Sequence, residues 1–258
     1  MAFDWGFFWR YLLEPSSVYL HGLWLTLSLS VISQGLGTVI GLFAALGRLS
    51  RFRSIQAVVR FYVWVMRGTP LLVQIVFIYT GLAAGNIFRF EDIDLGIIFL
   101  PGNIQAAIVA LSLNEGAYMS EIIRAGIASV DIGQTEAAKS LGMTYWKLMR
   151  RIILPQAARV IIPPLGNDFN GMLKNTTLVS VIGVPELLLA TQMITSATFR
   201  VFELYTVVAL YYLTLTTLWG FVQQAIERRY GEPSRNLPQN VGIAAGLRKF
   251  LARRGSVR

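Results

Sequence analysis

The sequence contains no cysteine and a single histidine, His21, among its 258 residues. Without cysteine the chain has no disulfide framework, no thiolate nucleophile and no zinc or iron–sulfur site with cysteine ligands. One histidine cannot form a histidine cluster. The G-x-x-x-x-G-K-[ST] motif is also missing, and no Gly-Lys pair occurs anywhere, so this chain lacks the phosphate-binding loop of an ATPase. The sequence therefore contains no set of metal ligands and no activated nucleophile that would indicate an enzyme.

Charge is scarce as well. Charged residues make up 14% of the chain, whereas a soluble domain carries about 25%. Hydrophobic residues reach 54%, and the mean hydropathy is +0.54. This composition indicates a chain that lies in a lipid bilayer. The opening MAFDWGFF has no positively charged region, so no cleaved signal peptide is expected.

Long apolar runs locate the predicted membrane spans. A helix that crosses a bilayer needs about 20 predominantly apolar residues. Pro101 and Gly102 interrupt the middle run, so its helix is expected to begin near Asn103, and the fourth run is weakened by Pro163 and Pro164. The fold class predicted is an all-α polytopic membrane protein with five spans, at 22–47, 61–88, about 103–124, 160–184 and 204–226.

The placement of basic residues predicts the orientation of these spans. The net charge is +9, which fits either a nucleic-acid partner or a basic face on anionic lipid. Most Lys and Arg fall in three segments, 48–60, 124–159 and 228–258, whereas the opposite side has only Arg10, Arg89 and Arg200. By the positive-inside rule the N-terminus lies outside and the C-terminus in the cytoplasm. Topology thus accounts for the basic surplus, and no nucleic-acid partner is expected.

The long cytoplasmic segment 126–159 contains a recognisable pattern. Glu136, Ala137 and Ala138 are followed after three residues by Gly142, and nine residues later by 152–155, which read Ile-Ile-Leu-Pro. Paired alanines allow a helix to approach a partner closely, a glycine permits a left-handed turn at a helix end, and a proline is expected to stop the following segment. The pattern resembles the EAA loop of permease subunits of ABC importers. The resemblance implies an ATPase-coupling role for Glu136, Ala137, Ala138, Gly142, Leu154 and Pro155.

Further motifs resemble a narrower branch, the polar amino acid permeases that import histidine, glutamine, glutamate or arginine. The resemblance covers about 22–228. It is carried by 67–74 (RGTPLLVQ), 117–127 (AYMSEIIRAGI), Gly133-Gln134, 154–157 (LPQA), Asn167, 173–178 (LKNTTL) and Glu186-Leu187.

This resemblance implies the transmembrane domain of a type I ABC importer in the cytoplasmic (inner) membrane, with no cofactor of its own. Its implied partners are two ATP-binding subunits that bind ATP and Mg, a second permease chain, identical or paralogous, and an extracytoplasmic amino-acid-binding protein. The expected divisions are an interfacial segment 1–21, the transmembrane domain 22–228 and a basic cytoplasmic tail 229–258, in which 241–254 is expected to form a surface helix.

Polar side chains at membrane depth are costly and are candidates for function. A zwitterionic amino acid needs an anion for its ammonium group and a cation or helix N-terminus for its carboxylate. Glu115, Tyr118 and Glu121 are spaced three apart, so one helical face is expected to carry all of them. Gly68 and Pro70 predict a broken helix with free backbone groups. Asp168 and Lys174 are six residues apart and do not face each other on a regular helix, so packing or gating is expected for both. The candidates for the substrate pathway are Arg67, Thr69, Pro70, Gln74, Glu115, Tyr118, Glu121, Lys174, Asn175 and Thr176.

Two alternatives stay open at this stage. The importer can carry another small solute, such as an opine or methionine, which a substrate panel would distinguish. A carrier or channel that works without an ATPase belongs to a different class, and ATP-dependence of uptake would distinguish it.

Overall fold

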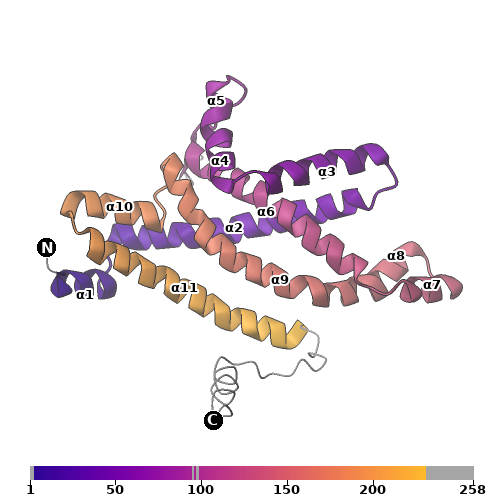
Figure 1. Cartoon of the computed structure of the whole chain (residues 1–258). Helices are drawn as coiled ribbons and strands as arrows, with labels where there is room; N and C mark the ends of the chain where they lie inside the picture. Colours follow the sequence, from indigo (N-terminus) through magenta and orange to yellow (C-terminus); the bar gives the residue numbers. More distant parts are fainter. Residues whose placement is uncertain (1–2, 95, 97–98, 231–258) are drawn as a thin grey trace, which may run out of the picture.

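The structure is a computed structural model that describes residues 3–94, 96 and 99–230. Four long helices form the body of a bundle, with short helices at both of its ends (Figure 1). They are α2 (Ser17–Arg48), α6 (Gly102–Ala128), α9 (Leu154–Asn175) and α11 (Val201–Tyr230). At one end lie α1 (Trp5–Leu13) and α10 (Leu187–Thr198), and at the other α7 (Ile132–Ser140) and α8 (Tyr145–Leu148).

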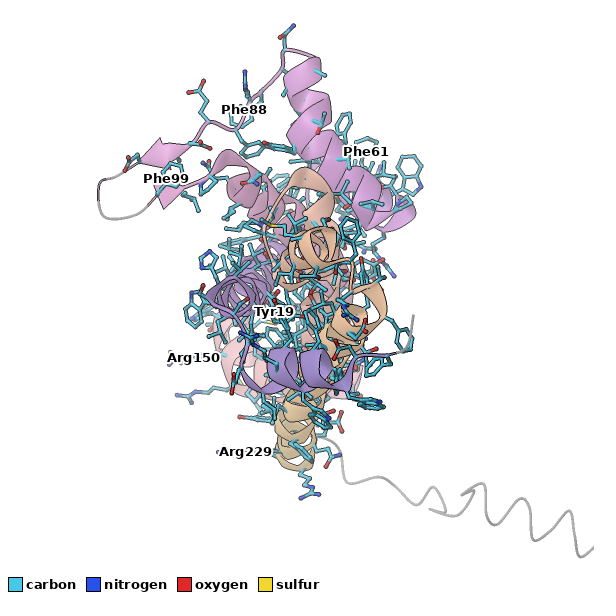
Figure 2. All side chains as sticks on the ribbon, turned by 90° about the vertical axis from the view of Figure 1, so that its left-hand side faces the viewer. Tyr19, Phe61, Phe88, Phe99, Arg150 and Arg229 are labelled. Carbon is cyan, nitrogen blue, oxygen red and sulfur yellow. The ribbon has the colours of Figure 1, made fainter. Side chains whose placement is uncertain are left out.

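A second group of short elements projects from this body. It comprises α3 (Arg53–Gly68), α4 (Leu71–Val76), the π-helical turn η1 (Phe77–Gly81), α5 (Leu82–Ala84) and the antiparallel pair β1 (Ile93–Asp94) and β2 (Phe99–Leu100), in which Ile93 lies opposite Leu100. Phe88 and Phe99 lie in this projecting region, and Phe61 of α3 points away from the bundle (Figure 2). Two further turns, η2 (Met149–Ile153) and the 3-10 helix η3 (Thr176–Ile182), flank α9.

The core forms where α2 and α6 lie side by side and run in the same direction. A Cβ added to Gly37 would meet Cβ of Glu115 at 2.6 Å, and one added to Gly41 would overlap the side chain of Met119. Small residues permit such close approach between helices in a membrane, where packing replaces the hydrophobic effect as the driving force. Ala106, Ala107 and Ala110 of α6 are completely buried or nearly so. α6 is therefore the central helix of the fold.

The helix α9 passes through two prolines without a break. Pro163 and Pro164 have no N–H to donate, yet α9 is helical from Leu154 to Asn175. Side chains of the neighbouring helix α11 bind carbonyl groups along this stretch. Trp219 Nε1 donates to the carbonyl of Gly166 at 2.7 Å, and Gln223 Nε2 donates to that of Pro163 at 2.9 Å. These two bonds attach α9 to α11 beside the prolines; the carbonyls that Pro163 and Pro164 leave without an N–H donor are those of Arg159 and Val160.

The predicted spans correspond to helices, but their bounds and number differ from the prediction. Within the described residues, two helices, α2 and α11, are long and apolar enough to cross a membrane, and up to four spans result if each of two bent helix pairs counts as one. Those pairs are α3 with Leu71–Ala84, bent by 110°, and Tyr145–Ile182 with α10, bent by 51°. The predicted third span is the helix α6, which is not among them. Polar residues such as Asn103, Gln105 and Asn114 reduce its apolar character, and neighbouring helices cover it.

The predicted N-terminal boundary at residue 22 falls inside α2, which begins at Ser17. α1 packs against α11, where Tyr211 Oη donates to the carbonyl of Leu12 at 3.1 Å. The predicted cytoplasmic tail and its surface helix lie outside the described residues, apart from Arg229 and Tyr230, and the side chain of Arg229 projects from the bundle (Figure 2).

Candidate functional site

The glycine of the EAA-like pattern closes the helix α7. Gly142 has φ +73°, in the left-handed region that favours glycine. Its N–H donates to the carbonyl of Lys139 at 2.9 Å, and the N–H of Met143 donates to that of Ala138 at 3.0 Å. These two bonds form a Schellman motif, which satisfies the last carbonyl groups of a helix. At the other end Asp131 caps α7 through a bond from the N–H of Gly133 at 2.6 Å.

The two alanines of the pattern have different surroundings. Glu136 and Ala137 are exposed on α7, whereas Ala138 is buried and packs in a cluster with Leu148 and Ile153. Only one alanine of the pair is therefore open to a partner, which differs from the expectation that both would face it. Next to this cluster lies a hollow of about 530 Å³, which Thr135, Lys139 and Tyr145 help to line.

The proline at the end of the pattern does not stop a helix, which corrects the sequence prediction. Leu154 and Pro155 are the first residues of α9, and the chain is helical without interruption from Tyr145 through η2 into α9. Because helical turns run from η2 directly into α9, Pro155 lies inside a continuous helical stretch, and one backbone hydrogen bond is absent at that point. The π-helical turn η2 directly before it provides the change of register that a proline requires.

The break at Pro70 forms an elbow between α3 and α4, and it leaves few backbone groups free. Pro70 cannot donate to the carbonyl of Met66. That carbonyl instead accepts from Gln74 Nε2 at 2.7 Å and from Asn114 Nδ2 at 3.1 Å. Thr69 Oγ1 donates to the carbonyl of Val65 at 2.8 Å. The predicted broken helix is present, but side chains of this chain bind the carbonyls that were expected to face substrate.

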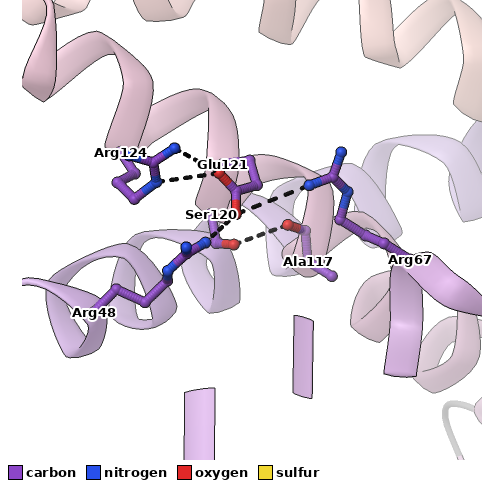
Figure 3. Close-up of polar contacts among 6 residues, drawn as sticks. All are labelled: Arg48, Arg67, Ala117, Ser120, Glu121 and Arg124. Atoms are coloured by element: carbon purple, nitrogen blue, oxygen red, sulfur yellow. Dashed lines mark hydrogen bonds and ion pairs between the residues drawn. The ribbon is translucent and has the colours of Figure 1, made fainter. Parts of the chain in front are cut away.

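Glu121 joins three helices in a cluster of ion pairs (Figure 3). Its carboxylate accepts hydrogen bonds from Arg48, the last residue of α2, and from Nε and Nη2 of Arg124 at 3.1 and 3.0 Å. Nη1 of Arg67 in α3 lies 3.8 Å from the same carboxylate. The Arg67 guanidinium also lies over the ring of Tyr118, 5.2 Å from its centre. Arg67 thus contacts Tyr118 and Glu121, two of the three residues expected on one helical face, whereas Glu115 is not part of this cluster.

Glu115 belongs to a separate polar cluster, deeper between α2, α6 and α9. Gln34 Nε2 donates to its carboxylate at 2.7 Å, and Asp168 is near enough to interact with it electrostatically. Ser33 Oγ, Gln34 Oε1, Ser112 Oγ and one oxygen of Asp168 are buried and bond to no described residue. Neither Glu115 nor Asp168 forms an ion pair with a cation among the described residues, and several buried oxygens of these helices have no hydrogen-bond partner there.

The remaining candidates lie at the end of α9. Lys174 is exposed, and it forms no ion pair with a described residue; Asn175 is half-buried. Thr176 is completely buried and donates to the carbonyl of Leu173 at 2.9 Å. This group is not brought together with Glu115 or with the Glu121 cluster. Within the described residues no three His, Asp or Glu side chains gather as metal ligands.

Comparison with known proteins gives the family. The family described as binding-protein-dependent transport system inner membrane component matches residues 37–232. The chain belongs to this family. Its members are membrane components of transport systems that also use a binding protein, so a membrane protein that is not itself the catalyst is supported. The resemblance drawn from the EAA loop and the 67–74 motif is confirmed at this level.

The relatives of this permease chain include transporters of several amino acids and their derivatives. It is 36% identical over 229 residues to the glutamine transport system permease protein GlnP of Escherichia coli (strain K12), covering 89% of this chain and 98% of the relative. It is 40% identical over 217 residues to the octopine transport system permease protein OccM of Rhizobium radiobacter, covering 83% of this chain and 85% of the relative.

A solved structure agrees with these relatives. The crystal structure of an amino acid ABC transporter with histidines contains a chain that is 40% identical, with a TM-score of 0.78 and coverage of 89% of this chain and 100% of that one. The type I importer transmembrane fold is thereby supported.

Sequence reasoning overlooked some residues of these clusters in the permease. Gln34 was read only as part of an apolar span, although an amide in such a run is itself a signal of a buried polar contact. Arg48 counted only toward topology, yet it bonds Glu121. Glu186 is named in the sequence analysis only as part of the Glu186-Leu187 motif, with no role of its own. It is completely buried, caps α10 through the N–H groups of Leu188 and Leu189, and accepts from Tyr212 Oη at 2.9 Å.

Proposed function

We propose that the chain is the permease subunit of an ATP-driven importer that moves a polar amino acid across the cytoplasmic membrane by alternating access. The observation that carries the proposal is family membership together with 36% identity to a glutamine permease and 40% identity to a chain of an amino acid ABC transporter. In this proposal the chain crosses the membrane five times, with its N-terminus outside. It pairs with a second permease, two ATP-binding subunits and an extracytoplasmic binding protein.

The ATPase is proposed to dock on the segment 126–159. The exposed part of α7 carries the small side chain of Ala137 beside Glu136 and Lys139, and the Schellman motif at Gly142 fixes where that helix ends. Ala138 attaches α7 to Leu148 and Ile153, so a push on α7 moves the following helix as well. ATP and Mg are bound by the partner, because the chain has no phosphate-binding loop of its own.

The deeper cluster is proposed to contact the ammonium group of the amino acid. Glu115 and Asp168 are two buried or half-buried carboxylates that influence each other electrostatically, and Ser112, one turn before Glu115, has a hydroxyl oxygen with no described partner. A buried site with negative charge and unpaired hydrogen-bond acceptors is stabilised when a positively charged group binds there. Glu115→Gln should therefore reduce uptake by about tenfold or more, as loss of a charged hydrogen bond of roughly 1.5–3 kcal/mol implies, without loss of assembly. Wild-type uptake in this variant would remove Glu115 from the site.

One alternative substrate has an observation in its favour. The octopine permease is 40% identical to this chain, so an amino-acid derivative of the opine class is the second candidate. Both candidates share the ammonium and carboxylate groups on which the argument above depends.

Purification and reconstitution test the proposal. The tagged chain is purified from native membranes in mild detergent, and every subunit that accompanies it is identified by mass. The complex is then reconstituted with its binding protein and supplied with labelled L-glutamine, L-arginine, L-histidine and octopine, with and without ATP. We expect an ATP-binding subunit and ATP-dependent uptake of one of the four.

Glu136→Lys is expected to release the ATP-binding subunit because it replaces the carboxylate of the docking face by a second ammonium group beside Lys139. Glu91→Lys is the matched control, since Glu91 is exposed in the 86–92 region outside α7. A chain that is purified alone even after crosslinking, and that transports without ATP, would instead be a carrier or channel.

A further inference from the structure

One carboxylate binds the ends of two helices to a third. Glu121 lies in α6, Arg48 is the last residue of α2, and Arg67 is the penultimate residue of α3 (Figure 3). Arg124 occupies a further position on the same carboxylate from one turn along α6. The side chains are partly exposed, from 21% for Arg48 to 44% for Arg67, and Glu121 itself is 23% exposed. The cluster therefore holds three helices together through a single acidic group.

The Arg67 side of this cluster leads to the elbow. Arg67 lies three residues before Pro70, where the chain turns by 110° into α4. The turn is stiffened because Gln74 Nε2 donates to Met66, to the carbonyl of Thr69 and to its hydroxyl, and because Asn114 Nδ2 donates to Gln74 Oε1 at 2.9 Å. A displacement of Arg67 is thus passed on to α4 and is not absorbed by a flexible joint.

The Glu121 side of the cluster leads to α7. α6 is helical without interruption as far as Ala128, and three residues separate it from α7. Ile127, six residues after Glu121, packs against the cluster of Ala138, Leu148 and Ile153 that attaches α7. A movement of α7 is therefore carried by a rigid helix to Glu121.

The balance of charge makes Glu121 the essential member. Three guanidinium groups surround one carboxylate, and each of the three pairs with no other acidic residue in the described part of the chain. Without the carboxylate the arginines repel one another, to an extent that water reduces because the side chains are partly exposed. The ends of α2 and α3 would then be held less firmly against α6, although the contact of α2 with α6 at Gly41 and Ala45 remains.

We propose that Glu121 is a positioning residue that transmits movement of α7 to the elbow between α3 and α4, with Arg67 as the receiving group. The inference rests on the proposed function, because it concerns how hydrolysis by the partner ATPase is coupled to the pathway. It assigns to Glu121 and Arg67 a role in coupling, and not in direct contact with the amino acid.

The test compares transport with hydrolysis in the reconstituted complex. Glu121→Gln keeps the size of the side chain and removes its charge. We expect uptake of the amino acid that the wild-type complex transports to fall by about tenfold, in the range of ordinary coupling between sites, while ATP hydrolysis changes by less than about twofold. The number of amino acid molecules moved per ATP hydrolysed is the deciding quantity, since a loss of folded complex lowers both rates and leaves their ratio unchanged.

Glu203→Gln is the matched control. Glu203 pairs with Arg200 at i,i−3, as Glu121 pairs with Arg124 at i,i+3, but it lies at the α1 end of the bundle. In Glu203→Gln the number of amino acid molecules moved per ATP hydrolysed should equal that of the wild type. If E121Q does not assemble, Arg67→Gln provides the same test, because R67Q leaves the bonds from Arg48 and Arg124 to Glu121 in place. The number of amino acid molecules moved per ATP hydrolysed should also fall in R67Q.

A double substitution distinguishes a joint action of Arg48 and Glu121 from two independent effects. If Arg48 and Glu121 act together, R48Q/E121Q should lose no more of the ratio than E121Q alone. A wild-type ratio in both E121Q and R67Q would overturn the inference while leaving the proposed function intact. Absence of ATP-driven uptake in the wild-type complex would overturn both.

Discussion

Gly35 and Gly37 lie two residues apart in α2, yet their surroundings are opposite. A Cβ on Gly37 would collide with the side chain of Glu115, whereas one on Gly35 would meet no described atom within 4 Å. We expect Gly37→Leu to destabilise the contact between α2 and α6 by about 1–3 kcal/mol, the usual cost of overpacking. Gly35→Leu should have little effect. The difference in stability is measured by thermal unfolding of the two variants in detergent, with the loss of monodisperse protein as the readout.

Equal stabilities of these two variants would contradict the close approach at Gly37. A loss in Gly35→Leu alone would mean that the other face of α2 carries the contact, either within the chain or against a partner.

The same scale shows why individual contacts were only partly predictable from the sequence. The spacing of Glu115, Tyr118 and Glu121 predicted one shared polar face, but only Tyr118 and Glu121 have a common partner, Arg67, and Glu115 bonds to Gln34 in a separate cluster. The spacing did not indicate Arg48 or Gln34, because each reaches its partner from a helix more than 70 residues away in the sequence. A pattern along one helix gives the face that a residue occupies, whereas the identity of its partner depends on how two helices align.

At the scale of elements, Gly142 determines where α7 ends. Its φ of +73° is costly for any residue with a Cβ. Gly142→Ala should destabilise this end of α7 by about 1 kcal/mol and weaken the recovery of the ATP-binding subunit in purification. Gly220→Ala is the control, since Gly220 lies within α11 with nothing within 4 Å of an added Cβ. That change should be neutral or slightly stabilising, because alanine favours a helix.

Recovery of the partner from Gly142→Ala at the level of Gly220→Ala would show that the end of α7 is not what the partner recognises. Thermal unfolding of both variants distinguishes this outcome from a general loss of folded protein.

Elements were more predictable than their bounds. Apolar runs located helices in all five predicted spans, because length and hydropathy depend on local sequence alone. The behaviour of prolines was not predictable in the same way. Pro70 breaks a helix, whereas Pro155, Pro163 and Pro164 lie within one. A π-helical turn precedes Pro155, and Trp219 and Gln223 of α11 bond to carbonyls beside Pro163 and Pro164; a reading of 154–175 alone contains none of these features.

At the scale of the whole molecule, the absence of cysteine provides a direct test of orientation. Any introduced cysteine is the only one in the chain, so its labelling has no background from the chain itself. Ser140 at the end of α7 and Ser196 in α10 are both exposed serines, which differ from cysteine by one atom. The positive-inside rule places Ser140 in the cytoplasm and Ser196 outside, with one span between them.

In sealed right-side-out vesicles, a membrane-impermeant maleimide should label Ser196→Cys at once and Ser140→Cys only after detergent is added. Labelling of Ser140→Cys alone before detergent would show the opposite orientation and would contradict the prediction made from the placement of basic residues. Equal labelling of both before detergent would mean that the bent pair Tyr145–Ile182 and α10 does not cross the membrane, which leaves fewer than five spans. The expected pattern instead requires that the pair crosses once, and it places α7, with Glu136 and Ala137, on the side where an ATPase has access to nucleotide.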